Sequence, residues 1–251
     1  MRRAIALIEL IFAIVVIAIT LISVPNLIST TTKASNNAIT QEAISNASSY
    51  LNLIMSSFWD EESTEPKLEN PLLYVTKEDI ALKEANISGY LIGRRVGSPK
   101  STSRRFKNKL TGLGRVTATI PSKLGFETAE TIPDDIDDFN NRTITLVNVQ
   151  TASATTGDYK DKSVQITTTV KYLKDSPKVG AGYKNIETLE FINPFDNKNI
   201  ETKGSSNIKI ITLNLSSKYN KNEKIVLKAF SCNIGASKLK EKKFWEMPLL
   251  L

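Results

Sequence analysis

The densest group of possible metal ligands in this sequence lies in the stretch PDDIDDFNN, residues 133–141. Its four carboxylates belong to Asp134, Asp135, Asp137 and Asp138. Calcium prefers oxygen ligands of this kind, although the spacing is not that of an EF-hand, because the stretch has no glycine at the turn and no closing glutamate. Two interpretations stay open: a calcium site formed by these four aspartates, and a solvated acidic turn. We expect no other cofactor.

The composition excludes the commonest catalytic groups. The 251 residues include no histidine and one cysteine, Cys232. A Ser-His-Asp or Cys-His nucleophile arrangement is therefore impossible, and so are the usual histidine-containing zinc sites. Cys232 lies in the apolar stretch KIVLKAFSC, which favours a buried, inert thiol. We expect a protein that is not an enzyme.

A basic stretch, residues 94–109, contains no acidic residue, and the whole chain has a formal charge of +7. Its cations are Arg94, Arg95, Lys100, Arg104, Arg105, Lys107 and Lys109. With Tyr90 and Phe106 nearby, such a stretch could contact the phosphates of DNA. A solvated loop, or a contact with acidic neighbours, explains the same residues. DNA is therefore one candidate partner.

An apolar run from Ile5 to Val24 is long enough to span a membrane. Its 20 residues would form a helix of ~30 Å, the thickness of the hydrocarbon layer. Arg2 and Arg3 precede the run, so the positive-inside rule predicts a cytoplasmic N-terminus and a single crossing of the lipid bilayer. The run contains one acid, Glu9. A carboxylate at membrane depth either reaches back to the headgroups or marks a functional contact.

The stretch ALIELIFAIVVIAI resembles the N-terminus of type IV pilins and of the pseudopilins of type II secretion systems. Met1–Ala4 corresponds to the short basic leader, and Leu7, Ile8, Glu9 and Leu10 match the core of the family motif. The resemblance implies that a prepilin peptidase cleaves between Ala4 and Ile5 and that the new amine of Ile5 is methylated. It also implies that Glu9 pairs with the N-terminal amine of a neighbouring subunit during assembly.

The sequence departs from the family pattern at three places. Ala4 stands where the family has glycine before the cut, Ile5 and Ala6 replace Phe-Thr, and Pro25 comes one residue before the helix-kinking proline. The resemblance covers about 25 residues. It leaves open how efficiently Ala4 is accepted at the cleavage site.

The resemblance implies a minor pilin-like or pseudopilin subunit of a type II secretion, type IV pilus or DNA-uptake machine. Its expected partners are the prepilin peptidase, other pilin-like subunits and the assembly platform of the bacterial inner membrane. The C-terminal part would be periplasmic until the subunit joins a pilus or pseudopilus. The alternative is a single-pass, membrane-anchored periplasmic binding module that does not polymerise.

The remaining pattern predicts an α+β fold, in which a long N-terminal helix, transmembrane in its first half, packs on an antiparallel sheet. We expect a leader at 1–4, a transmembrane half-helix at 5–25 kinked at Pro25, an amphipathic half-helix at 26–58 and a globular domain at 59–251. The apolar face of the second half consists of Ala43, Ala47, Tyr50, Leu51, Ile54 and Phe58, at helical spacing.

Alternation of apolar and polar residues predicts the strands. It is clearest in SVQITTTVKYL, where Val164, Ile166, Val170 and Tyr172 fall on one face. We also expect strands at 115–120 and 143–150, and a hairpin formed by 207–215 and 224–232. A short helix is expected within residues 77–90, and the basic and apolar tail 238–251 is expected to dock on the domain or on a partner.

Overall fold

The computed structural model describes residues 2–63, 71–107, 115–127, 130–147, 163–175, 193–196, 199–217 and 224–235. The chain forms two compact units, Met1–Asn46 and Ala47–Leu251. Their common element is the helix α1, Arg2–Ser56, which begins in the first unit and ends in the second. The predicted long N-terminal helix is therefore confirmed, within two or three residues at each end.

The first unit is entirely helical in its described residues. Pro25 lies inside α1 and does not end it. The threonines that follow are compatible with the helix because their hydroxyls donate to carbonyls one turn earlier. The shortest of these bonds joins Thr32 to the carbonyl of Ile28 at 2.8 Å. Such bonds satisfy the hydroxyl within the helix itself.

The apolar side chains between residues 6 and 28 are exposed around the helix. Ile8 is 62% exposed and Phe12 is 71% exposed, and the same holds along the run as far as Ile28. By length and composition, the segment Ala6–Ser56 can cross a membrane. A helix that is apolar on all sides is normally buried in a bilayer or among other helices.

The last turns of α1 belong to the second, folded unit. Ala47 and Ile54 are fully buried there. Tyr50 meets Phe139 edge to face, with ring centroids 5.8 Å apart. These positions confirm the C-terminal part of the predicted apolar face, and they anchor the end of the helix in the core of the unit.

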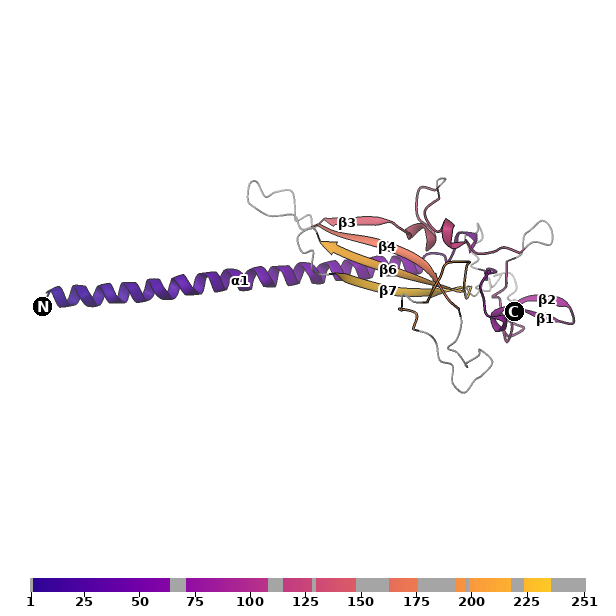
Figure 1. Ribbon diagram of the computed structural model, residues 1–251, viewed down its shortest axis with the longest axis horizontal. Coiled ribbons are helices and arrows are strands. Elements are labelled where there is room, and N and C mark those ends of the chain that lie inside the picture. Colours follow the sequence, from indigo (N-terminus) through magenta and orange to yellow (C-terminus); the bar gives the residue numbers. More distant parts are fainter. Residues whose placement is uncertain are drawn as a thin grey trace, which may run out of the picture. The chain divides into compact units, whose positions relative to one another are not determined.

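The folded unit is built on an antiparallel sheet of five strands (Figure 1). The strands are β3 (Thr143–Val147), β4 (Ser163–Leu173), β5 (Ile200–Glu201), β6 (Ile208–Ser217) and β7 (Ile225–Cys232). The order is β3-β4-β6-β7, and β5 pairs with the far end of β4. The longest register runs from Val164 opposite Ser217 to Leu173 opposite Ile208. The pairing of β6 with β7 confirms the predicted hairpin.

The alternation predicted for β4 is confirmed by burial. Val164, Ile166, Val170 and Tyr172 are buried, whereas Gln165 and Lys171 between them are exposed. Thr168 extends the buried row. The residues of β6 that lie opposite this row are also buried: Lys209, Ile211, Leu213 and Leu215. The core of the unit therefore includes one lysine among its aliphatic residues.

A second, two-stranded sheet pairs β1 (Glu84–Ile87) with β2 (Tyr90–Arg95). Ser88 and Gly89, which join them, both have positive φ angles, as a tight hairpin turn requires. The short helix predicted within residues 77–90 is a single 3-10 turn, η2 (Ile80–Leu82), capped by the side chain of Asp79. The strand β1 follows within that segment, from Glu84 to Ile87.

The strand predicted at 115–120 is not formed. Thr117 makes one isolated parallel bridge with Tyr74, through hydrogen bonds of 3.0 and 2.8 Å on either side. Residues on both sides of Tyr74 bond to other segments, so the pairing cannot extend, and the 3-10 turn η3 (Pro121–Lys123) follows. Tyr74 stacks instead on Phe106, in a small core cluster with Leu72.

Two further 3-10 turns frame the polar interior of the folded unit. They are η1 (Glu61–Ser63), just after α1, and η4 (Asp137–Phe139), in the acidic stretch. Phe58 bridges Asp135 in parallel, so the chain leaving α1 runs beside the acidic stretch. The predicted strand residues 148–150 and the tail 238–251 lie outside the described residues.

Candidate functional site

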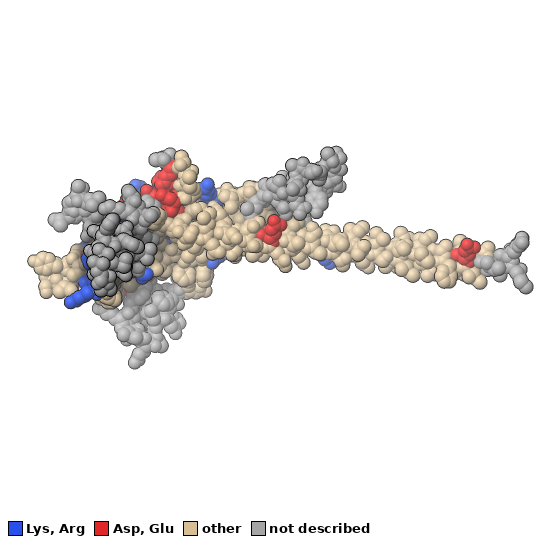
Figure 2. Space-filling model, turned by 180° about the vertical axis from the view of Figure 1, so that it is seen from behind, with Lys and Arg blue, Asp and Glu red and all other residues tan. Residues whose placement is uncertain are grey.

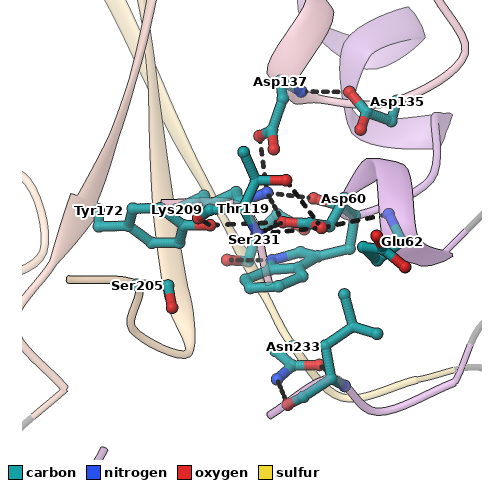
Figure 3. A network of polar contacts seen from close by, with 12 residues as sticks. Asp60, Glu62, Thr119, Asp135, Asp137, Tyr172, Ser205, Lys209, Ser231 and Asn233 are labelled. Atoms are coloured by element: carbon teal, nitrogen blue, oxygen red, sulfur yellow. Dashed lines mark hydrogen bonds and ion pairs between the residues drawn. The ribbon is translucent and has the colours of Figure 1, made fainter. Parts of the chain in front are cut away.

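Lys209 of β6 carries its charge into the interior of the folded unit (Figure 3). Its side chain is fully buried, and the ammonium group donates to Asp60 at 2.8 Å and to Asp137 at 2.6 Å. A third bond reaches the carbonyl of Trp59 at 2.7 Å. The nitrogen also lies 4.2 Å from the centre of the Trp59 ring and 5.3 Å from that of Tyr172. All three donors of the ammonium are thus matched by acceptors.

Asp60 is the second centre of this buried network. Its carboxylate accepts the backbone N–H of Thr119 at 3.0 Å and the Thr119 hydroxyl at 3.2 Å. The backbone N–H of Glu62 also donates to it, at 3.3 Å. The hydroxyl of Tyr172 lies 3.3 Å away and donates to the carbonyl of Thr119 at 2.7 Å. Asp60 therefore ties the chain after α1 to the core strands.

The aspartates of the acidic stretch, residues 133–141, make different contacts. Asp135 accepts the backbone N–H groups of Asp137 at 2.6 Å and Asp138 at 3.0 Å, which closes the turn η4. Asp137 points to Lys209 (Figure 3). Asp135, Asp137 and Asp138 are at most 1% exposed, whereas Asp134 is exposed. The interpretation as a solvated acidic turn is therefore wrong for three of the four, because backbone amides and a buried lysine stabilise them inside.

The electrostatics follow from burial and from the shared charges. Burial, together with the charge of Asp137, raises the pKa of Asp135 to about 9. Burial raises the pKa of Asp137 to about 7, against the opposing effect of Lys209. Burial alone would lower the pKa of Lys209, but the charges of Asp137 and Asp60 outweigh it and raise this pKa. The lysine therefore stays charged, and the fully buried network is a structural centre that solvent does not reach.

A second group of acids, here called the acidic cluster, lies next to this network. It consists of Glu61, Glu127, Glu130, Asp134 and Asp138. Carboxylate oxygens of Glu61, Glu130 and Asp134 lie within 4.8 Å of one another, as do those of Glu127, Glu130 and Asp138. Figure 2 shows acidic side chains gathered on one area of the folded unit. Of the four aspartates predicted as calcium ligands, Asp134 and Asp138 belong to this cluster, and Asp135 and Asp137 lie outside it.

The carboxylates of the acidic cluster repel one another. Burial and the charges of Asp138, Glu61, Asp134 and Glu127 raise the pKa of Glu130 to about 7. The pKa values of Glu61, Glu127 and Asp134 are raised in the same way, by burial first and by neighbouring carboxylates next. Carboxylates of the acidic cluster and its neighbours are among the charges that raise the pKa values of these four groups. The cluster thus concentrates negative charge at a place that solutes can reach.

The residues of the predicted assembly site lie in α1. Ala4 and Ile5 are within the helix, and their side chains lie outside the described part of the structure. Glu9 is exposed. Comparison of the chain with protein-family models, with curated proteins and with solved structures finds no match. The pilin-like roles of Ala4, Ile5 and Glu9 therefore remain predictions.

Some residues of the basic stretch, 94–109, make contacts within the folded unit. Arg95 donates to the side chain of Asn207 at 2.7 Å and to the carbonyl of Asn233 at 2.8 Å. Lys107 donates to the carbonyl of Glu62 at 2.7 Å. Phe106 is buried. Three residues of the predicted DNA contact are thus engaged within the folded unit, while Tyr90 is exposed and Lys109 lies outside the described residues.

Sequence reasoning missed the partners that organise both polar sites. One signal was available for Lys209. It lies two and four residues before the apolar Ile211 and Leu213, and alternate residues of a strand point to the same face, so the sequence already indicated an inward position. Glu127 and Glu130 carried no comparable signal. They are ordinary surface-type residues in sequence, and only the fold brings them to Asp138.

Proposed function

We propose that the chain is a pilin-like structural subunit, which is processed by a prepilin peptidase and assembled through its N-terminal helix into a pilus or pseudopilus. The filament would serve type II secretion, a type IV pilus or DNA uptake. Before assembly the subunit would sit in the bacterial inner membrane, with its N-terminus in the cytoplasm and its folded unit in the periplasm.

One observation carries the proposal. Between residues 6 and 32 of α1 the sequence has a single charged residue, Glu9, and the apolar side chains around it are exposed. Such a helix needs an apolar environment that the described part of its own chain does not provide, and a carboxylate within it needs an opposite charge. A neighbouring subunit with a free N-terminal amine would supply both.

Pairing of that kind would also set the register of assembly. A buried carboxylate is strongly destabilising when its partner is absent, so neighbouring helices that slide out of register would leave the charge unpaired. Glu9 would then favour one staggering of the subunits over all others. The folded unit, anchored at the end of the same helix, would follow the spacing that the helices adopt.

Processing is the direct test. Co-expression of the full chain with a prepilin peptidase is expected to yield a protein that begins at Ile5, with a methylated amine, as measured by intact mass and N-terminal sequencing. The control is the same chain with Ala4→Glu, which places a charge at the proposed cut. A chain that still begins at Met1 in the presence of an active peptidase would contradict the proposal.

Glu9 has a separate test with a matched control on the same helix. Glu9→Val is expected to leave membrane insertion intact and to reduce co-assembly with pilin-like partners, measured by crosslinking in membranes. Glu42→Val removes a carboxylate 33 positions further along α1 and is expected to leave co-assembly unchanged. Equal crosslinking of the Glu9→Val variant and the unaltered chain would favour a membrane-anchored binding module that does not polymerise.

A further inference from the structure

The carboxylates of Glu127, Glu130 and Asp138 come from two segments of the folded unit and converge on one point. Their oxygens lie within 4.8 Å of one another. Calcium binds oxygens at 2.3–2.6 Å, so two ligands on opposite sides of one ion are ~5 Å apart. The three oxygens are therefore close enough to share a single ion.

The same three residues have oxygens without a hydrogen-bond donor. One oxygen each of Glu127, Glu130 and Asp138 is buried without a matched donor among the described residues, and the carboxyls of Glu127 and Asp138 lie close enough to share a proton. Asp138 is the strongest case, because its side chain is 1% exposed. Its other oxygen is fixed by the backbone N–H of Asp134 at 2.9 Å. The oxygen without a matched donor is buried as well, and a buried carboxylate oxygen needs a donor or a cation.

The surrounding charge favours a cation over a donor group. Glu61 and Asp134 form the adjoining group of oxygens and share Glu130 with the first three. Five carboxylates at one place repel one another, and a divalent cation would remove that repulsion. Flexible side chains of two lengths suit the six to eight ligands of calcium better than the strict octahedron of magnesium.

We propose that Glu127, Glu130 and Asp138 bind one hard divalent cation of the calcium class, with Glu61 and Asp134 as additional ligands. The site differs from one made by the four neighbouring aspartates, because two of those serve the turn η4 and Lys209. Its ligands join η1, which follows α1, to Glu127 and Glu130 and to η4. The bound ion would clamp these three segments, and this role does not depend on assembly into a filament.

The test is calcium binding by the full chain in detergent after treatment with a chelator. Titration calorimetry is expected to show one saturable calcium ion per chain, with a Kd of about 10⁻⁴–10⁻³ M, the range of extracellular calcium modules. Calcium at 100 times the Kd is expected to raise the melting temperature of the folded unit by about 5–10 °C. Sodium chloride of equal ionic strength is expected to give no comparable rise.

Glu130→Gln is expected to weaken calcium binding at least tenfold, because Glu130 belongs to both groups of oxygens. Glu62→Gln is the matched control, since it removes the same charge from an exposed neighbour outside the cluster. It is expected to change the affinity less than about twofold, since exposed charges are screened. Without calcium, Glu130→Gln is expected to melt no lower than the unaltered chain, because it relieves repulsion.

Three results would overturn the cation site: no saturable binding, stabilisation that sodium chloride reproduces, or equal weakening by Glu62→Gln and Glu130→Gln. If Glu130→Gln melts lower in the chelator, Glu127→Gln takes its place with the same expected tenfold loss. Both tests are independent of N-terminal processing, so a chain that is not cleaved could still bind calcium, and the reverse also holds.

Discussion

Glu9 and Lys209 both lie in apolar stretches of sequence, but they stand in different surroundings. Lys209 is fully buried in the folded unit, and two carboxylates and a carbonyl of the same chain receive its three donors. Glu9 lies on an exposed helix, and no hydrogen bond or ion pair joins it to the described part of the chain. Lys209 thus has its partners within the fold, whereas our proposal gives Glu9 a partner on another molecule.

The largest effect that this comparison predicts is a loss of stability of the folded unit when Lys209 is replaced. Lys209→Met leaves Asp60 and Asp137 buried without their cation, and the breaking of a buried ion pair costs about 3–5 kcal/mol. For a unit of this size that corresponds to a fall in melting temperature of roughly 10 °C. Thermal unfolding followed by circular dichroism measures it in the full chain.

The matched control is Lys171→Met, on the neighbouring strand. Lys171 is exposed, so its loss is expected to change the melting temperature by less than about 2 °C. The triple variant Lys209→Met, Asp60→Asn, Asp137→Asn removes the charges together and is expected to recover part of the loss. Equal melting of the Lys209→Met and Lys171→Met variants would show that the buried network contributes no stability.

The second prediction adds a charge to the other unit. Ile17→Asp places a second carboxylate in the apolar run of α1, where insertion costs about 2.5–3.5 kcal/mol for a central charge. The inserted fraction, measured by alkaline extraction of membranes, is expected to fall, while the melting temperature of the folded unit stays the same. Ile17→Val is the control. Equal insertion of the Ile17→Asp and Ile17→Val variants would mean that α1 does not cross the hydrocarbon layer.

The smallest predicted effect lies at the edge of the buried network. Tyr172→Phe removes the hydroxyl that donates to the carbonyl of Thr119 at 2.7 Å. The loss of one such buried bond costs about 1–2 kcal/mol, since a buried carbonyl is left without its donor. The ring still packs against Trp59, so the ion pairs of Lys209 are expected to survive. A loss as large as that of Lys209→Met, measured by the same melts, would show that the network acts as one unit.

The elements with a clear period were predictable. The apolar run and the spacing of Ala47, Tyr50 and Ile54 gave a helix that ends within two residues of the prediction, and the alternation in β4 gave its buried face. The segment 115–120 has the same strand-like composition, yet it forms one bridge to Tyr74. Composition indicates whether a segment can be a strand, but the residues on both sides of Tyr74 bond to other segments, so the pairing stops there.

The polar sites were predictable only in part. The sequence identified the acidic stretch as unusual, but it could not divide Asp134 and Asp138 from Asp135 and Asp137. That division depends on Lys209 and on Glu127 and Glu130, which reach the stretch through the fold. Burial of charge is decided by such distant partners, and local sequence carries little information about them.

The buried network also bears on when the protein folds. Lys209 lies 149 residues after Asp60 and 72 residues after Asp137 along the chain. Contacts of such long sequence separation form slowly, because a long loop must close before they are gained. A partly synthesised chain that lacks β6 would have to bury two unpaired carboxylates, so we expect it to remain open. The folded unit would then close cooperatively once the strand bearing Lys209 arrives.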